Sequence, residues 1–192
     1  MKHTAIILKK LYPYDQKIAL LDQKMGRINA RVFNQSFIEG AIIEYSFETK
    51  YGVIAIEQSE YLYIPLQWGI VDILFLHHVL EVCYHFIPLE SCAEGIFDLL
   101  CMLFKNEQLE WAVSAKKFFL CKLFLLVGMY PQTDFIKTKI ARMLLYISIE
   151  DMIQLKIEKD EQLLMDQWLM HCIAKHHLGF DFKTIGFLTE SR

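Results

Sequence analysis

Basic and aromatic residues of the kinds that bind nucleic acid are clustered near the N-terminus of this chain. Six cations and two tyrosines fall within one short stretch: Lys9, Lys10, Tyr12, Tyr14, Lys17, Lys24, Arg27 and Arg31. On one face of a folded domain, the cations would bind phosphates and the rings would stack on bases, which is how single-stranded nucleic acid is held. The same residues also fit an ordinary solvated surface, so both interpretations stay open.

A second pattern with possible chemistry is the set His77, Glu81 and His85, which repeats every four residues and so falls on one helix face. Two imidazoles and a carboxylate can bind a metal ion. The spacing of a zinc-protease helix and a fourth ligand are both missing, however. We therefore expect a polar stripe or hydrogen bonds between the two modules here, and no metal or other cofactor.

Motifs for covalent or phosphate chemistry are missing from the sequence. It contains no G-x-S-x-G turn for a serine nucleophile, and its glycines form no phosphate-binding loop. The cysteines are odd in number and lie in apolar contexts, namely Cys83, Cys92, Cys101, Cys121 and Cys172. These features predict a protein that is not an enzyme, with free thiols and a cytoplasmic location.

Composition sets broad limits on the fold and on the partners. Hydrophobic residues make up 54% of the 192-residue chain and charged residues 22%, which is enough for a sizeable core. The formal net charge is −3, the wrong sign for a protein that coats nucleic acid with its whole surface. A local basic patch remains compatible with this charge.

The first part of the chain, residues 1–66, has the pattern of a small β-barrel. Short β-rich segments are separated by turn residues, and the expected strands are Thr4–Lys9, Lys17–Asp22, Arg27–Phe33, Gly40–Phe47 and Val53–Glu57. Five short strands at this regular spacing are typical of a closed barrel of the OB-fold or SH3-like kind. Periodicity alone does not choose between the two folds.

The remaining part, residues 67–192, has helical periodicity. We expect helices over Ile70–Phe86, from Glu90 or Ser91 to Phe104, over Leu109–Tyr130, from Thr133 onward, over Ser148–Lys156 and over Lys159–Leu178. The helix at Leu109–Tyr130 is apolar around nearly its whole circumference, as in a buried core helix or a membrane span. Its unbroken apolar run is shorter than the roughly 20 residues that a bilayer requires, so we expect a core helix and no membrane association.

Several segments, in chain order, resemble the RecO family of recombination mediators. The similar segments are AIILKK and KIALLDQKMGRI at the N-terminus, IEQSE at Ile56–Glu60, FDLLCMLF at Phe97–Phe104, FFLCKLFLLVGMYPQ at Phe118–Gln132 and HHLGFDFKTIGFL at His176–Leu188. The most specific of these is the exit of the central helix, Gly128-Met129-Tyr130-Pro131. The resemblance spans most of the chain.

The resemblance implies an α+β protein with an N-terminal five-stranded OB-fold barrel and an all-α helical domain. It also implies a function in recombinational DNA repair: binding single-stranded DNA, annealing strands and loading recombinase together with RecR and single-strand-binding protein. In the family, the acidic tail of single-strand-binding protein docks on the helical domain. We expect Lys117 and Lys122, the cations of the central helix, to contact such a tail.

Two departures from the family pattern leave an alternative open. The family carries a basic segment after the third strand, where this chain has Phe33-Asn34-Gln35-Ser36. The four-cysteine insertion that follows the central helix in many members is also missing, so the resemblance supports no structural zinc. The alternative is an interaction adaptor that has lost DNA binding, and an unrelated barrel fused to a helical bundle also stays open.

Overall fold

The computed structural model describes residues 1–11, 16–33, 35–91, 94–106, 111–129, 141–156 and 158–175. The chain forms two compact units, Met1–Lys105 and Asn106–Arg192. Strands give way to helices between residues 63 and 66, where the sequence predicts this change. The compact units divide after Lys105 instead, so the first unit contains helices as well as strands.

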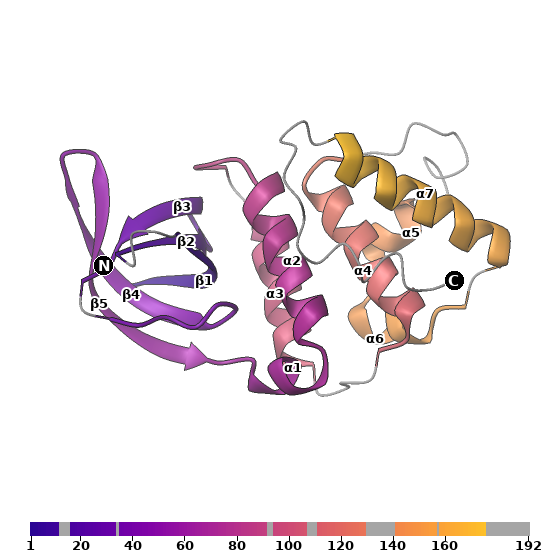
Figure 1. Cartoon of the computed structure of the whole chain (residues 1–192), viewed down its shortest axis with the longest axis horizontal. Helices are drawn as coiled ribbons and strands as arrows, with labels where there is room; N and C mark the ends of the chain where they lie inside the picture. Colours follow the sequence, from indigo (N-terminus) through magenta and orange to yellow (C-terminus); the bar gives the residue numbers. More distant parts are fainter. Residues whose placement is uncertain are drawn as a thin grey trace. The chain divides into compact units, whose positions relative to one another are not determined.

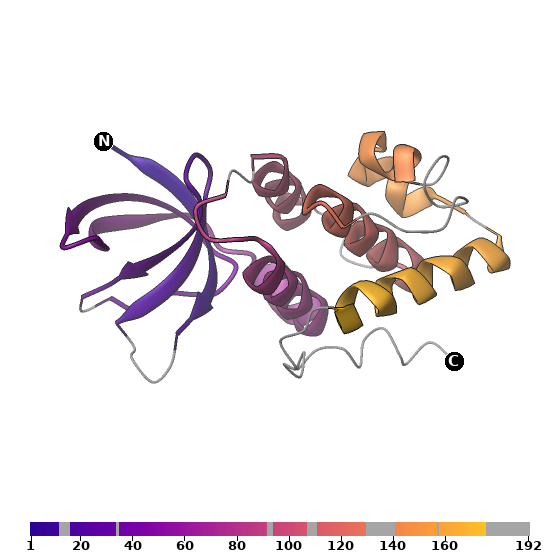
Figure 2. The same ribbon diagram turned by 90° about the horizontal axis from the view of Figure 1, so that it is seen from above.

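Five strands of the first unit form a closed barrel (Figures 1 and 2). They are β1 (His3–Lys10), β2 (Lys17–Asp22), β3 (Gly26–Arg31), β4 (Ile42–Lys50) and β5 (Val53–Tyr63). The order around the barrel is β1-β2-β3-β5-β4, and β4 pairs back with β1 to close it. β3 and β5 are parallel and the other pairs are antiparallel. The α+β prediction of a five-stranded barrel followed by helices is confirmed.

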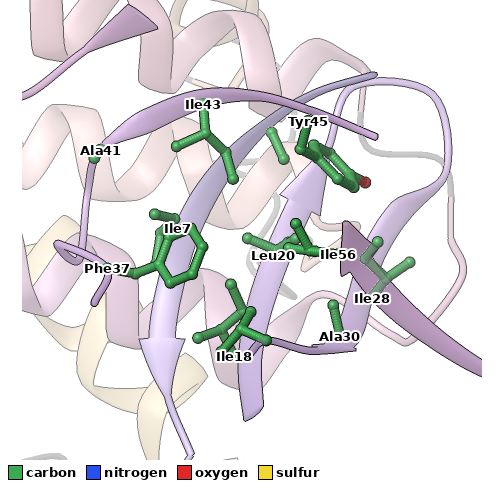
Figure 3. Close-up of a cluster of buried hydrophobic side chains, with 12 residues drawn as sticks. Ile7, Ile18, Leu20, Ile28, Ala30, Phe37, Ala41, Ile43, Tyr45 and Ile56 are labelled. Atoms are coloured by element: carbon green, nitrogen blue, oxygen red, sulfur yellow. The ribbon is translucent and has the colours of Figure 1, made fainter. Parts of the chain in front are cut away.

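The interior of the barrel is filled by alternate residues of the strands (Figure 3). They are mostly branched aliphatic side chains, with Phe37 from the β3–β4 connection and Tyr45 from β4. Their neighbours in sequence point outward, because successive side chains of a strand lie on opposite faces. This alternation is what made the strands recognisable in the sequence.

The outer side of β1 and β2 is also buried. Ile6, Leu8, Ala19 and Leu21 have at most 2% of their surface exposed, although they alternate with the core-facing residues. The helix α2 (Ile73–Phe86) packs on β1 and covers this side. β1 and β2 are therefore buried on both faces, as their nearly continuous apolar sequences indicate.

Two further helices complete the first unit, α1 (Leu66–Val71) and α3 (Glu94–Lys105). The sequence predicts one helix over Ile70–Phe86, but the structure has a break at Asp72, which has φ −152°. The Asp72 carboxylate accepts a hydrogen bond from the amide of Phe75 and so caps α2. Trp68 of α1 is fully buried, and its Nε1 donates to the carbonyl of Leu103 in α3.

The second unit is helical and is built around α4 (Val113–Leu126). The helices α5 (Ala141–Tyr146), α6 (Ile149–Gln154) and α7 (Lys159–Lys175) all pack against it. Phe118 to Cys121 and Leu123 to Leu125 are at most 1% exposed, which confirms the prediction of a central core helix. The ends of the predicted helix, Leu109 and Tyr130, lie outside the described residues. No helix in the described ranges is long and apolar enough to cross a membrane.

A buried histidine in the first unit predicts sensitivity to acid. His78 of α2 is fully buried, and burial lowers its pKa to about 4. In the unfolded chain the pKa is near 6.5, so below that pH the unfolded state binds a proton that the folded state excludes. We expect the free energy of unfolding to fall by about 3 kcal/mol between pH 7 and pH 4 through this residue alone.

Urea unfolding of the wild type and of His78→Leu, compared at pH values from 7 to 4, measures this contribution. The difference between the two proteins should shift by about 3 kcal/mol across the range, in favour of the variant at low pH. An NMR titration of the His78 ring gives its folded-state pKa directly. A midpoint near 6.5 would contradict the prediction.

Candidate nucleic-acid interface

The outer surface of the barrel carries a row of side chains that crosses four strands. Lys17 of β2 lies opposite Arg31 of β3, Arg31 is beside Ala55 of β5, and Ala55 lies opposite Glu48 of β4. Ile18 and Ala30 face the core, so the neighbouring Lys17 and Arg31 face outward, and both are exposed. The row therefore begins with two cations side by side, a favourable position for a phosphate group.

A pocket of about 430 Å³ lies along this row, and we call it the Arg31 groove. Its lining residues come from β3, β4, β5 and the segments next to them: Arg31, Phe33, Glu48, Lys50, Tyr51, Val53 and Ala55. Phe33 is 55% exposed, and Tyr51 is fully exposed in the tight turn between β4 and β5. Two aromatic rings in contact with solvent beside two cations are suited to base stacking combined with phosphate binding.

An ion pair sets the charge on one side of the groove. The Nζ of Lys50 lies 2.5 Å from the Oε1 of Glu48, and this hydrogen bond raises the pKa of Lys50. Lys50 therefore remains a cation at neutral pH. Both side chains are partly exposed, so an incoming phosphate competes with the Glu48 carboxylate in water and the pair itself adds little stability.

Lys9 and Arg27, which the sequence predicts to bind DNA, both lie on the ring of Tyr84 in α2. The Nζ of Lys9 is 4.6 Å from the ring centroid and the Cζ of Arg27 is 5.3 Å from it. Arg27 also donates through Nη1 to the carbonyl of Tyr84, and burial lowers its pKa. Both cations thus join the barrel to α2, and neither lines the Arg31 groove.

The other predicted residues of the barrel are dispersed. Lys10 is half-buried at the end of β1, where its amide donates to Glu39. Lys24 is exposed in the β2–β3 turn, at the far end of these strands from Arg31 and roughly 17 Å along them. Tyr12 and Tyr14 lie outside the described residues. Among the described members of the predicted set, the structure thus brings together two separate pairs, Lys17 with Arg31 on the barrel and Lys9 with Arg27 at Tyr84.

Three residues of the groove were not predicted from the sequence as binding residues: Phe33, Lys50 and Tyr51. The β3–β5 pairing brings the end of β3 beside the β4–β5 turn, a contact between segments about twenty residues apart that no local pattern reveals. A local signal did exist in Lys50-Tyr51-Gly52. A cation and an aromatic ring next to a turn glycine place both side chains at the tip of a hairpin.

The two cations predicted to bind a partner's tail have contacts within the second unit. The Nζ of Lys117 lies 2.8 Å from the Oδ1 of Asp166 in α7, and its side chain is only 12% exposed. The Nζ of Lys122 donates to the carbonyls of Leu145 and Ile147, at 3.2 and 2.6 Å, where a cation complements the end of α5. Both lysines thus connect α4 to neighbouring segments. Their binding of an acidic tail stays a prediction.

The remaining candidates for chemistry form no site in the described part of the chain. His77 lies 3.8 Å from Glu39, with its Nδ1 facing the Oε2, and no three potential metal ligands gather among the described residues. Burial raises the pKa of the Cys83 and Cys121 thiols, which makes them poor nucleophiles.

No protein-family model matches the chain, and no curated protein sequence matches it.

Proposed function

We propose that this protein binds single-stranded nucleic acid through the Arg31 groove and Lys17. The observation that carries the proposal is the placement of exposed cations and two exposed rings around one pocket of a five-stranded barrel. OB-folds bind oligonucleotides on the face of strands 2 and 3 and with the loops after strands 1 and 4. Lys17 and Arg31 belong to that face, and Tyr51 belongs to the turn after β4.

The specific role that we propose is that of a RecO-like mediator of recombinational DNA repair. Support comes from the sequence resemblance, in which several similar segments occur in the order that the family has, and from a barrel followed by helices. Such a mediator anneals complementary strands in the cytoplasm and acts with RecR-like and single-strand-binding partners. A strand-annealing assay with complementary oligonucleotides tests this role beyond simple binding.

Fluorescence anisotropy with a labelled oligothymidine of about 20 nucleotides at low salt tests the binding itself. We expect Arg31→Glu and Lys50→Glu each to weaken binding by about tenfold or more, because each loses one phosphate contact and adds a repulsive charge. Phe33→Ala and Tyr51→Ala should each weaken it about 5- to 100-fold, the usual range for a lost stacking contact. Lys159→Glu, an identical charge change at an exposed site in α7, is the control.

The salt dependence separates the two kinds of contact. The charge variants should lower the slope of log affinity against log salt by about one unit, whereas the aromatic variants should leave it unchanged. Absence of binding by the wild type at low salt would contradict the proposal. Equal losses in Arg31→Glu and Lys159→Glu would show that only the net charge matters.

A second candidate function is an interaction adaptor that has lost DNA binding. The engagement of Lys9 and Arg27 on Tyr84 favours it, because two of the predicted phosphate contacts hold the barrel to α2 instead. The adaptor would fail to bind the oligonucleotide and would still bind a RecR-like partner or the tail of single-strand-binding protein. The wild-type titration therefore distinguishes the two candidates in one measurement.

A further inference from the structure

The Arg31 groove contains a carboxylate among its cations and rings. Glu48 lines the pocket together with Arg31 and Lys50, and its side chain is 38% exposed. A carboxylate repels the phosphates that the two cations attract, so it opposes any binding that depends on the nucleic-acid backbone alone. Its place in the pocket is therefore better suited to a contact with another part of the ligand, and the bases are the part that carries no charge.

The strand order places Glu48 across the groove from Arg31. β5 lies between β3 and β4, and its residue Ala55 is beside Arg31 on one side and opposite Glu48 on the other. Neighbouring strands are about 4.8 Å apart, so the strands that carry the guanidinium and the carboxylate are separated by roughly 10 Å. Between them the lining is apolar and consists of Val53 and Ala55. A flat base can therefore lie over β5 with its edge toward Glu48.

The two exposed rings of the groove favour the same arrangement. Phe33 and Tyr51 line the same pocket as Glu48. Stacking uses the face of a base and leaves the hydrogen-bonding groups of its edge free. A base stacked on either ring can thus direct its edge to the carboxylate, while Arg31 and Lys50 attract the phosphates on either side of it.

The chemistry of a carboxylate selects among the bases. An ionised carboxylate only accepts hydrogen bonds, and it does so through two oxygens side by side. Guanine alone among the four DNA bases has two donors side by side on its Watson–Crick edge, the ring N1–H and the 2-amino group. Adenine and cytosine have a ring acceptor next to their amino group, and thymine has a carbonyl on each side of its one N–H, so each of them sets an acceptor against the carboxylate.

We propose that Glu48 gives the Arg31 groove a preference for guanine in single-stranded nucleic acid. The inference rests on the proposed nucleic-acid binding and adds a base specificity to it. In the free protein, Lys50 holds the Glu48 carboxylate through its Oε1. A phosphate that attracts Lys50 releases this oxygen, and the N1–H and 2-amino group of guanine then bind the two carboxylate oxygens.

Oligonucleotides that differ in one base type test the preference. The parent is a labelled oligothymidine of about 20 nucleotides, in which every third thymine is replaced by guanine, adenine or hypoxanthine. Adenine controls for the stronger stacking of a purine, and hypoxanthine is guanine without the 2-amino group. By fluorescence anisotropy at low salt, we expect the guanine oligonucleotide to bind about fivefold or more tightly than the other two, the lower end of the range for a bidentate base contact.

Matched variants assign the preference to Glu48. Glu48→Gln should abolish it, because the amide has one acceptor oxygen and sets an NH₂ donor against the donors of guanine. The same variant should bind oligothymidine more tightly, since a repulsive charge is lost. Glu57→Gln is the control: Glu57 is an exposed residue of β5 that, like Glu48, contributes to raising the pKa of Lys50, but it is not part of the pocket lining. It should also strengthen oligothymidine binding and should keep the preference for guanine.

Two results would overturn the inference while leaving the proposed function intact. One is binding of the guanine, adenine and hypoxanthine oligonucleotides with equal affinity. The other is a preference for guanine that persists in Glu48→Gln or disappears equally in Glu57→Gln. Absence of binding to all of the oligonucleotides would instead contradict the proposed function, and the base preference with it.

Discussion

Alanine at position 26 is expected to destabilise the first unit by roughly 3–5 kcal/mol, among the larger effects of a single substitution. Gly26 has φ +77°, in the left-handed region that glycine tolerates best. A Cβ there would lie 1.6 Å from the carbonyl oxygen of Ser91. The segment around Ser91 would have to move, breaking the hydrogen bond from the amide of Glu90 to the carbonyl of Arg27.

Gly52→Ala is the matched control for this prediction. Gly52 has φ +74°, yet nothing lies within 4 Å of a Cβ built on it. Its replacement should therefore lower the free energy of unfolding only by the cost of holding alanine in the left-handed conformation, about 1–2 kcal/mol. Thermal unfolding measures both variants, since 1 kcal/mol shifts the midpoint by roughly 4–8 °C for a unit of this size. Equal destabilisation would show that the close approach to Ser91 is unimportant.

Asp22→Ala is expected to destabilise the barrel by about 3 kcal/mol or more, because it removes a buried acceptor with several donors. Asp22 is 1% exposed. Its Oδ1 accepts from the amides of Lys24 and Met25 at 2.8 and 2.7 Å, and its Oδ2 accepts from the Tyr45 hydroxyl at 2.8 Å. The Nδ1 of His3 lies 3.3 Å from the same Oδ2. Alanine would leave these buried polar groups without their acceptor.

Tyr45→Phe separates the contributions at this site. It removes one hydrogen bond and leaves the turn amides satisfied, so it should cost about 1 kcal/mol. The double variant should be less destabilised than the sum of the two single variants, because the two residues share an interaction. Urea unfolding of the wild type and the three variants measures the coupling. Strict additivity would contradict a direct Asp22–Tyr45 contribution.

The strands of the barrel were predictable because their side chains alternate or run continuously apolar. β2 was predicted with the bounds it has, since turn residues flank it on both sides. β5 extends to Tyr63, well beyond the predicted Glu57. Its outer half contains Glu57, Gln58, Ser59 and Glu60, and pairing with β4 rather than its own propensity keeps it extended.

For the helices too, some features follow from the local sequence pattern and others from packing. α4 was predictable as a core helix because apolar residues surround it. The break between α1 and α2 was not, since Ile70 and Val71 continue the apolar pattern through Asp72. An aspartate inside a helical pattern can be the N-cap of a new helix, as Asp72 is here. The packing of Trp68 of α1 against α3, which no local pattern reveals, accompanies this break.

The candidate surface was only partly predictable, because sequence proximity is a poor guide to position on a barrel. Lys9 and Arg27 share the basic stretch with Arg31, yet α2 places Tyr84 against them. Lys50 and Tyr51 lie about twenty residues from Arg31, yet the β3–β5 pair brings them to its groove. A cluster of cations and rings was visible in the sequence, but which of them share one surface depends on the pairing of the strands.

The covering of β1 and β2 by α2 has a consequence for synthesis of the protein. A nascent chain that has emerged only to residue 66 holds all five strands, but the aliphatic outer side of Ile6, Leu8, Ala19 and Leu21 has no cover. The contact of Gly26 and Arg27 with residues 89–91 forms later still. We therefore expect the barrel to complete its packing during synthesis only after α2 and the segment following it emerge, because its outer apolar side stays exposed until then.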